Sequence, residues 1–432
     1  MLRLLAHRDF PFYTPKGAFP VGGAVRDLLL GRRPLDLDFA AEDPLRAAEE
    51  AQGRLGGTLF PLDAARGQYR LVVGGRTLDF APLEGSLEAD LRRRDYRLNA
   101  LVWRKGAVFG LPGVEQDLRR RLLSLVSEEN LYQDSLRSLR GVRLATTLGL
   151  GLPQGTRQAL ARHAAFLRAH PEALPARERV REELGRLLLS PRAAFGLHLL
   201  ERAGLLGVYL PELLPLVGLE QGGVHHLCAW RHTLSVLFHL QWLWPQAPLE
   251  ARLAALYHDV GKPLTRRFDP ELGRYRFLGH AEVGAEVAKA ALLWLHFPKE
   301  TVEKAVQLIR RHMDRPPEGE KALRRFYFRR QDLLPALPYL MAADRLATSG
   351  VEGEAWKLLE ATQKALAEPL PKRPLLSGEE VMALLGLRPG PQVGQALSAL
   401  LEAQAEGRVK TPEEARAFLL YWRGNGRQAS AP

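Results

Sequence analysis

The sequence predicts an α+β protein, with a small α/β part at the N-terminus followed by helices to the end of the chain. Short apolar runs alternate with helical patterns in the first 105 residues, and from about residue 110 apolar residues recur with a helical period. The predicted strands are 18–21, 35–39, 69–73, 77–80 and 101–103. The 432 residues divide into four predicted parts: a head (1–145), a helical neck (146–215), a helical body (216–350) and a helical tail (351–432).

Composition restricts the class of protein and its partners. Hydrophobic residues make up 46% of the chain, and no run approaches the roughly 20 apolar residues of a membrane span. Neither a membrane partner nor a secretory signal is therefore expected. The single cysteine, Cys228, excludes an internal disulfide framework and is typical of a reducing cytoplasm. The net charge of +12 favours a nucleic-acid partner, with coding bias or heat adaptation as the alternative.

One stretch, residues 21–39 (VGGAVRDLLLGRRPLDLDF), begins with a glycine turn. Gly22 and Gly23 follow an apolar strand and precede an amphipathic helix. A glycine pair at such a turn lets backbone N–H groups approach phosphate oxygens, and the helix N-terminus favours negative charge. The turn is therefore a predicted phosphate-binding element.

The same stretch ends in paired carboxylates. Strand alternation places Asp36 and Asp38 on one face. Neighbouring carboxylates repel one another unless cations lie between them, and hard oxygen ligands suit Mg²⁺. Two such ions can activate an attacking hydroxyl and bind a triphosphate, so Asp36 and Asp38 are the predicted catalytic, Mg²⁺-binding residues. Asp79 is a candidate third carboxylate, with a solvated strand residue as the alternative.

Residues 22–39 resemble the head motif of the tRNA nucleotidyltransferase and bacterial poly(A) polymerase family. These enzymes add nucleotides to RNA 3′ ends without a nucleic-acid template. The resemblance implies a polymerase-β-like head that uses CTP and ATP, in which Gly22, Gly23 and Arg26 bind phosphates.

A second segment, LRRRDYRLNAL (91–101), resembles the family motif RRDFTINAL. The resemblance assigns Arg94 and Asp95 to the sugar and phosphates of the incoming nucleotide and Asn99 to the same pocket. Family members that add all three nucleotides usually carry a longer flexible loop before this motif. The short link here favours addition of CC alone, and both CC and CCA addition stay open.

A third segment, LYQDSLRSLRGVRLATTLGL (131–150), resembles the family's EDxLRxLRAxRFAxxLGF. Helical spacing predicts a polar seam of Asp134, Arg137 and Arg140, with ion pairing on a solvated helix as the alternative. A carboxylate can accept a hydrogen bond from the exocyclic amine of cytosine or adenine while a guanidinium donates to the ring nitrogen. By the resemblance, Asp134 and Arg137 select the base. Arg140 and Arg143 would face the triphosphate.

The neck segment PARERVREELGRLLLSP (175–191) is similar to the family's ERIREELxKLL. Glu178, Arg181 and Glu182 are expected to brace the base-reading helix. In the tail, Gly390-Pro391 predicts a turn between two helices. It resembles the family's PGPxxGxxL segment, which implies contact with the tRNA body, and a packed helical cap is the alternative.

The body carries histidines and aspartates in the order H…HD…H…H…D, which resembles the HD phosphohydrolase superfamily. Each residue alone would more often be a solvated or hydrogen-bonded side chain. Imidazoles and carboxylates around divalent transition metals can activate water against phosphate esters. The resemblance implies a first metal held by His232, His258, Asp259 and Asp344. It assigns a second metal to His280 and His312, with Lys262 near the substrate phosphate.

Together these motifs identify the chain as a member of this family. We expect it to build or repair the tRNA 3′ terminus from CTP and ATP in the cytoplasm, with release of pyrophosphate. Some family members also have phosphatase and 2′,3′-cyclic phosphodiesterase activity in the HD part. A poly(A) polymerase, a mainly hydrolytic HD enzyme and a non-catalytic RNA-binding protein are the alternatives. The body and tail argue against the first, and the intact metal-binding motifs argue against the others.

Overall fold

The structure is a computed structural model that describes residues 3–7, 10–34, 36–222, 227–348 and 352–426. It forms two compact units. The first extends to Leu214 and includes Trp294–His296, and the second contains the rest from Pro215 onward. The boundaries predicted within these units, between head and neck and between body and tail, stay predictions.

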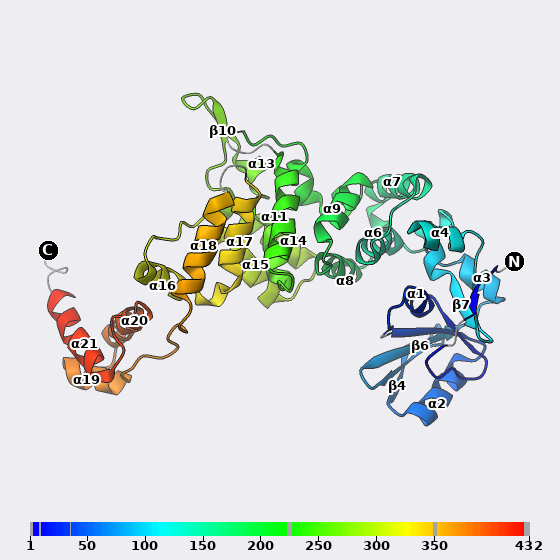
Figure 1. Cartoon of the computed structure of the whole chain (residues 1–432), viewed down its shortest axis with the longest axis horizontal. Coiled ribbons are helices and arrows are strands. Elements are labelled where there is room, and N and C mark those ends of the chain that lie inside the picture. Colours follow the sequence, from blue (N-terminus) through cyan, green and yellow to red (C-terminus); the bar gives the residue numbers. More distant parts are fainter. Residues whose placement is uncertain (1–2, 8–9, 35, 223–226, 349–351, 427–432) are drawn as a thin grey trace. The chain divides into compact units, whose positions relative to one another are not determined.

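The head contains an eight-stranded sheet in the order β1-β8-β7-β2-β3-β6-β5-β4 (Figure 1). Only β3 and β6 pair in parallel among these neighbours. The strands are β1 (Arg3–His7), β2 (Ala18–Val21), β3 (Asp36–Ala41), β4 (Thr58–Asp63), β5 (Gln68–Val73), β6 (Arg76–Pro82), β7 (Leu101–Arg104) and β8 (Ala107–Gly110). Each predicted strand is thus confirmed, except that Leu35 lies outside the described residues. β1, β4 and β8 were not predicted.

Alternation along β3 separates the core of the head from its polar face. Leu37 and Phe39 are buried, and Phe39 stacks on Phe80 of β6 with ring centroids 4.9 Å apart. Their cluster also contains three buried alanines of helix α2 (Pro44–Leu55). Helix α2 therefore covers the apolar face of β3, which leaves Asp36 and Asp38 on the opposite face.

The rest of the first unit is helical, as predicted. The helices are α1 (Gly23–Leu29), α3 (Leu87–Arg92), α4 (Val114–Arg120), α5 (Glu129–Gln133), α6 (Leu136–Leu148), α7 (Gln154–Ala169), α8 (Arg177–Leu188), α9 (Ala193–Arg202) and α10 (Leu206–Tyr209). Short 3-10 turns at Arg97–Asn99, Pro171–Ala173 and Pro211–Leu216 complete it.

The second unit is also mainly helical. Its helices are α11 (Ala229–Leu243), α12 (Leu249–Tyr257), α13 (Lys262–Thr265), α14 (His280–Trp294), α15 (Lys299–Arg311), α16 (Glu320–Phe328), α17 (Ala336–Leu346), α18 (Glu352–Ala365), α19 (Gly378–Leu385), α20 (Pro391–Ala405) and α21 (Pro412–Gly426), with a 3-10 turn at Gln331–Leu333. The predicted turn at Gly390-Pro391 is confirmed, because α19 and α20 flank it and share one apolar cluster. The expectation of helices throughout this region is wrong at one place, where β9 (Arg267–Asp269) and β10 (Arg274–Arg276) form a hairpin. None of the helices described is both long enough and apolar enough to cross a membrane.

Helix α6 packs against the second motif through a glycine. The ring of Tyr96 is fully buried, and its hydroxyl donates to the carbonyl oxygen of Arg137 over 2.9 Å. A Cβ at Gly141 would overlap the Tyr96 hydroxyl. We therefore expect Gly141→Ala to lower the free energy of unfolding by about 1–3 kcal/mol, because the overlap must displace packed groups.

Denaturant unfolding of the full chain measures this difference. Gly155→Ala is the matched control, because Gly155 is also helical and no neighbouring atom lies within 4 Å of its Cβ position. Alanine there should be neutral or stabilise by up to about 1 kcal/mol. Equal stability of the two variants would contradict the packing argument.

Candidate active site and metal centre

The polar face of the head forms a cavity of about 600 Å³. Ten of the twelve predicted head residues line it: Gly23, Arg26, Asp36, Asp38, Arg94, Asp95, Asn99, Arg137, Arg140 and Arg143. Gly22 and Asp134 are not among the lining residues. Motifs separated by up to about 100 residues thus contribute to one concave surface.

Asp36 and Asp38 lie on the cavity wall with exposed side chains. The hydroxyl of Thr77 donates to Asp36. Partial loss of water raises the pKa of Asp38 above its ordinary value; the carboxylates of Asp79 and Asp36 raise it further, against the effect of Arg94. A bound cation would relieve this repulsion, so the two carboxylates fit Mg²⁺ in the way that the sequence predicts.

Asp79 has a different environment. The register places it beside Asp38 on β6, and Arg70 of β5 lies opposite it. Arg70 donates two hydrogen bonds of 2.7 Å to the two oxygens of Asp79. Asp79 therefore lies beside Asp36 and Asp38 as predicted, but its charge is already matched by a guanidinium, and it is not among the cavity-lining residues.

The glycine turn leaves space for an arginine side chain. Gly22 has a φ of 70°, a left-handed value that favours glycine. A Cβ there would meet the Arg94 guanidinium at 2.7 Å. The guanidinium is held by buried Asp90, which accepts from it over 3.0 and 3.2 Å. Gly22 thus makes room for a cation, while Gly23 faces the cavity.

The second motif positions its neighbours through one chain of hydrogen bonds. Arg26 donates to Asn99 over 2.6 Å, and Asn99 donates to Asp95 over 2.9 Å. Asp95 also forms an ion pair with Arg140 at 3.5 Å. Because Asp95 is buried and already bonded, in this structure it orients the groups around it.

The predicted seam on the base-reading helix is wrong at its first residue. Helix α6 begins at Leu136, and Asp134 precedes it with an extended backbone (φ −146°, ψ 100°). Its carboxylate accepts from the Leu136 N–H over 3.3 Å and from Arg179 over 2.9 Å. The first N–H groups of a helix lack intrahelical partners, and Asp134, which lies one residue before the N-cap Ser135, supplies an acceptor to one of them. Arg137 does line the cavity and donates to the Asn130 carbonyl over 2.9 Å.

The brace predicted in the neck is also misassigned. Glu183 of α8, only 6% exposed, accepts from Arg143 over 2.6 Å and from Arg140 over 3.3 Å. The exposed Glu182 has one ion-pair partner among the described residues, Arg181 at 3.9 Å. Glu183 shares a face of α8 with Val180, Leu184 and Leu187. A charged residue within an apolar helical stripe was the signal that the sequence offered.

Two arginines are among the cavity residues that the sequence motifs did not predict. Arg33, after helix α1, and Arg186, on α8, line the same cavity and are exposed. Within the described chain, neither has a carboxylate partner. They add to the positive charge that the cavity presents to an anionic ligand.

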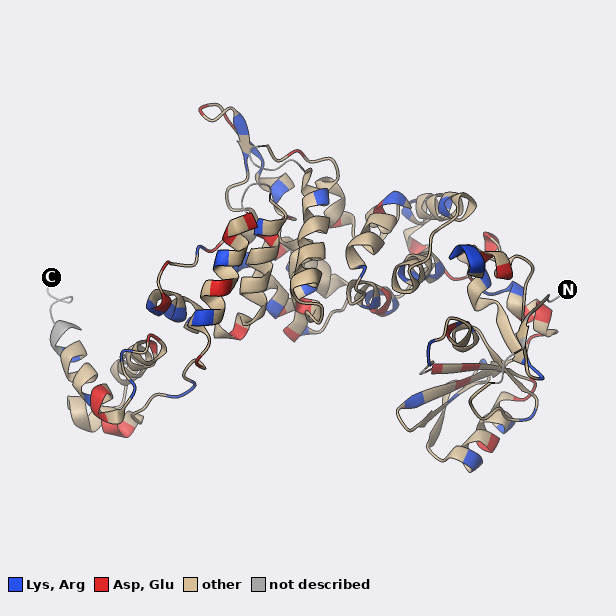
Figure 2. Ribbon diagram, in the orientation of Figure 1, with Lys and Arg blue, Asp and Glu red and all other residues tan. Residues whose placement is uncertain are grey.

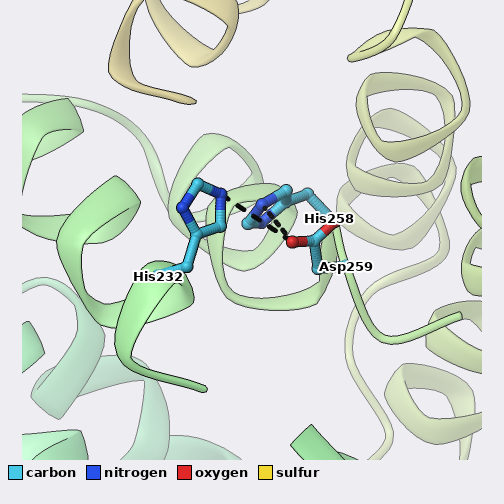
Figure 3. A group of neighbouring side chains, drawn as sticks. All are labelled: His232, His258 and Asp259. Carbon is cyan, nitrogen blue, oxygen red and sulfur yellow. Dashed lines mark ion pairs between the residues drawn. The ribbon is translucent and has the colours of Figure 1, made fainter. Parts of the chain in front are cut away.

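The second unit brings the HD residues together. Figure 3 shows the side chains of His232, His258 and Asp259 converging. Nε2 of His258 lies 3.2 Å and Nε2 of His232 lies 3.8 Å from Asp259 Oδ2. Asp344 of α17 accepts from His232 over 2.9 Å. The four residues assigned to the first metal are therefore neighbours.

The second predicted metal set gains a ligand. Nε2 of His280 lies 3.3 Å from Nε2 of His312 and 3.4 Å from Asp259 Oδ1. Two groups of side chains could each hold a cation, and Asp259 belongs to both. The sequence analysis assigned Asp259 to the first metal only. The structure gives it one oxygen toward each group.

Backbone carbonyls orient three of these histidines. Nδ1 of His258, His280 and His312 lies 2.9, 2.7 and 2.6 Å from the carbonyl oxygens of Ala255, Phe277 and Ile309, respectively. Donation from Nδ1–H leaves the Nε2 lone pair of each ring directed into the cluster. This is the tautomer that a metal ligand requires.

Electrostatics agree with a cation site. Burial lowers the pKa of His312 to about 4, so this ring is neutral at pH 7. The pKa of Asp259 lies well below its ordinary value, because the neighbouring His258 and Lys262 charges outweigh its burial. Neutral imidazole and ionised carboxylate are the forms that bind transition metals, so His312 and Asp259 are already in the binding form. His258 is not, because the carboxylates of Asp259 and Asp344 raise its pKa despite its burial, and a bound cation would displace that proton. Lys262 contacts Asp259 at 2.6 Å and borders the adjoining cavity, consistent with a place near the substrate phosphate.

Comparisons with known proteins agree with these two sites. Residues 18–124 match the model described as "Poly A polymerase head domain", and residues 149–216 match "Probable RNA and SrmB- binding site of polymerase A". Residues 229–349 match "HD domain". A CC-adding tRNA nucleotidyltransferase of Thermus thermophilus is 78% identical over 427 residues, which are 99% of this chain and 98% of that protein. This chain belongs to the tRNA nucleotidyltransferase family.

More distant members of the family share its fold. An A-adding tRNA nucleotidyltransferase of Deinococcus radiodurans is 47% identical over 94% of this chain and 96% of its own. The crystal structure of the Bacillus stearothermophilus CCA-adding enzyme with CTP is 25% identical, covers 96% of this chain and 95% of its own, and has a TM-score of 0.67. Nucleotidyltransferase heads and HD domains generally use divalent metals, which agrees with both carboxylate-containing sites.

A substitution of Glu183 tests whether its carboxylate stabilises the cavity arginines. Glu183→Gln would leave Arg140 and Arg143 without their shared countercharge, so we expect a loss of stability of roughly 2–4 kcal/mol. Urea unfolding measures this loss. Glu182→Gln, at the adjacent exposed position, is the control and should change stability by less than about 0.5 kcal/mol. Similar effects of the two substitutions would refute the role of Glu183.

Proposed function

We propose that this enzyme adds two cytidines to the 3′ end of tRNA from CTP and releases pyrophosphate. The observation that carries the proposal is the head cavity, where Asp36 and Asp38 lie among seven arginines. In this reaction the terminal RNA hydroxyl oxygen bonds to the α-phosphorus and loses its proton to water. The bond from that phosphorus to the bridging oxygen breaks, and pyrophosphate leaves.

Each group has a role in this step. Asp36 and Asp38 would hold Mg²⁺, which when bound lowers the pKa of the hydroxyl and offsets the triphosphate charge. Arg26, Arg94, Arg140 and Arg143 would bind the phosphates, because guanidinium groups match phosphate oxygens in pairs. Arg137 would donate to the cytosine ring. Asp134 would exchange Arg179 for the exocyclic amine of the base.

Restriction to CC has two supports. The link between β6 and α3 is only four residues long, from Leu83 to Ser86, where family members that add all three nucleotides usually carry a longer loop. The Thermus thermophilus relative is named CC-adding, and the A-adding relative is much less similar. ATP would then be used by a separate enzyme.

The same proposal includes a contact between the protein and the body of the tRNA substrate. The Thermotoga maritima CCA-adding enzyme, whose fold is shared with a TM-score of 0.62, was solved as a complex with tRNA. We place the helical tail α19–α21 against the tRNA body, and the resemblance of its PGPxxG turn supports this contact. The enzyme would serve maturation and repair of tRNA 3′ ends.

Three tRNA transcripts test the proposal: one ending before CCA, one ending after the first C and one ending after CC. Each is incubated with Mg²⁺ and CTP, ATP or both, and the products are resolved to single nucleotides. We expect extension to CC and no use of ATP on any transcript. Completion to CCA would contradict the restriction to CC while leaving the head chemistry intact.

We propose a second activity, hydrolysis of a phosphate ester in the second unit. The gathering of the half-buried Asp344 with five buried residues into one cluster supports it; the five are His232, His258, Asp259, His280 and His312. These residues would hold one or two divalent transition metals, which activate water when bound. The water oxygen bonds to phosphorus, the ester bond breaks, and the leaving oxygen takes a proton.

Paired alanine variants separate the two activities. Asp36→Ala/Asp38→Ala should reduce nucleotide addition by more than about 100-fold and leave hydrolysis of bis(p-nitrophenyl) phosphate unchanged, because the second site keeps its ligands. His258→Ala/Asp259→Ala should do the reverse and lower the metal content measured after dialysis. Loss of both activities in either variant would show that the sites do not act independently.

A further inference from the structure

A second cavity, of about 580 Å³, adjoins the metal centre in the second unit. His280, His312 and Asp344 border it on the metal side. Its other walls come from the β9–β10 hairpin with the residues that follow it to Leu278, and from the loop after α15. Figure 1 shows the hairpin extending from the helices of this unit. Neither the HD motif nor the metal ligands account for these walls.

The cavity has an excess of positive charge outside the metal centre. Arg274 of the hairpin and Arg315 of the loop line it, and both are exposed. Neither has a carboxylate partner within the part of the chain that the structure describes. Among the described residues, Arg345 has a single hydrogen-bond acceptor, the Met341 carbonyl oxygen, over 3.0 Å. These three guanidinium groups are therefore available to an anion.

The carboxylates in the same cavity are already engaged. Asp314 accepts from Arg330 over 2.8 Å. Asp259 contacts Lys262 at 2.6 Å, and Asp344 accepts from His232 over 2.9 Å. No lining carboxylate thus neutralises Arg274 or Arg315, and each guanidinium group can form charge-assisted hydrogen bonds with phosphate oxygens.

Aromatic side chains stand next to these cations. Tyr275 and Phe277 line the cavity, and Tyr275 is 39% exposed. Phe268 holds the Tyr275 ring edge-to-face with centroids 5.4 Å apart, and Arg266 covers the ring at 3.8 Å from its centroid. A fixed aromatic ring beside arginines is the combination that binds single-stranded nucleic acid, because bases stack on the ring and phosphates pair with the guanidinium groups.

We propose that this cavity is a binding subsite for the terminal dinucleotide of an RNA strand that ends in a phosphate. The terminal phosphate lies at the metal centre, and Arg274 and Arg315 bind the phosphate that joins the last two nucleotides. Tyr275 or Phe277 stacks on a base. The exposure of Arg274 and Arg315 lets the RNA chain continue away from the cavity. This inference rests on the proposed hydrolytic activity of the second unit.

Three substrates of increasing size test the subsite: bis(p-nitrophenyl) phosphate, a ribonucleoside 2′,3′-cyclic phosphate and a ribodinucleotide with the same cyclic end. We expect kcat/KM of the full chain to be at least about tenfold higher for the dinucleotide than for the mononucleotide, through a lower KM. In Arg274→Ala and Arg315→Ala, the ratio of dinucleotide to mononucleotide kcat/KM should fall about tenfold. Equal values for the two nucleotides in the wild-type enzyme would overturn the proposal.

Arg267→Ala is the matched control. Arg267 is an exposed arginine on the other strand of the same hairpin, where the strand register places it opposite Arg276. It is not among the residues that line this cavity. In this variant, the ratio of dinucleotide to mononucleotide kcat/KM should stay within about twofold of the wild-type ratio. A loss as large as that of Arg274→Ala would mean that general charge, rather than the subsite, attracts the substrate.

Equilibrium binding separates the subsite from hydrolysis. The probe is a fluorescein-labelled ribodinucleotide 3′-phosphate, followed by anisotropy with the full chain in the absence of nucleoside triphosphates. Binding that weakens about tenfold in Arg274→Ala and Arg315→Ala but not in Arg267→Ala supports the subsite, even if no substrate is hydrolysed and the hydrolytic proposal fails. Equal affinity of the probe for all variants overturns the proposal. In a separate competition experiment, stronger displacement of the probe by a nucleoside triphosphate than by an unlabelled dinucleotide also overturns it.

Discussion

Repulsion among arginines is the constraint on which the head depends. Seven guanidinium groups line one cavity, and buried carboxylates hold several of them. Asp90 pairs with both Arg93 and Arg94, and Glu183 pairs with both Arg140 and Arg143. Because Asp90 and Glu183 are each shared by two cations, the cavity is held together and still keeps a positive surplus for a triphosphate.

The two candidate metal sites are built from different ligands on different scaffolds. In the head, strand alternation exposes two hard carboxylates while helix α2 covers the apolar face of the same strand. In the second unit, helices supply imidazoles whose orientation comes from backbone carbonyls. The first arrangement suits Mg²⁺ and a triphosphate, and the second suits transition metals that activate water. The chain therefore offers two sets of potential metal ligands that have no residue in common.

Family resemblance and local patterns predicted much of the fold and of both sites. Period-two alternation located the central strands and the carboxylate pair, and ten of the twelve predicted head residues line one cavity. The predictions were wrong at two places where residue spacing alone did not decide the local structure. Asp134 was placed on a helix because its spacing fits, but a carboxylate at that point satisfies the free N–H of Leu136 instead. The hairpin β9–β10 was missed because its strands are only three residues long.

By itself, the sequence determined the family, the order of the parts and the residues that carry charge at each motif, because these follow from residue type and short-range spacing. Only the tertiary structure decided which partners those residues meet. Glu183 lies 40 residues from Arg143 along the chain. Packing of separate helices brings Asp259 next to both groups of potential metal ligands. Arg70 matches Asp79 through the strand register. Ion-pair energies depend on distance and burial, which arise only when distant segments pack together.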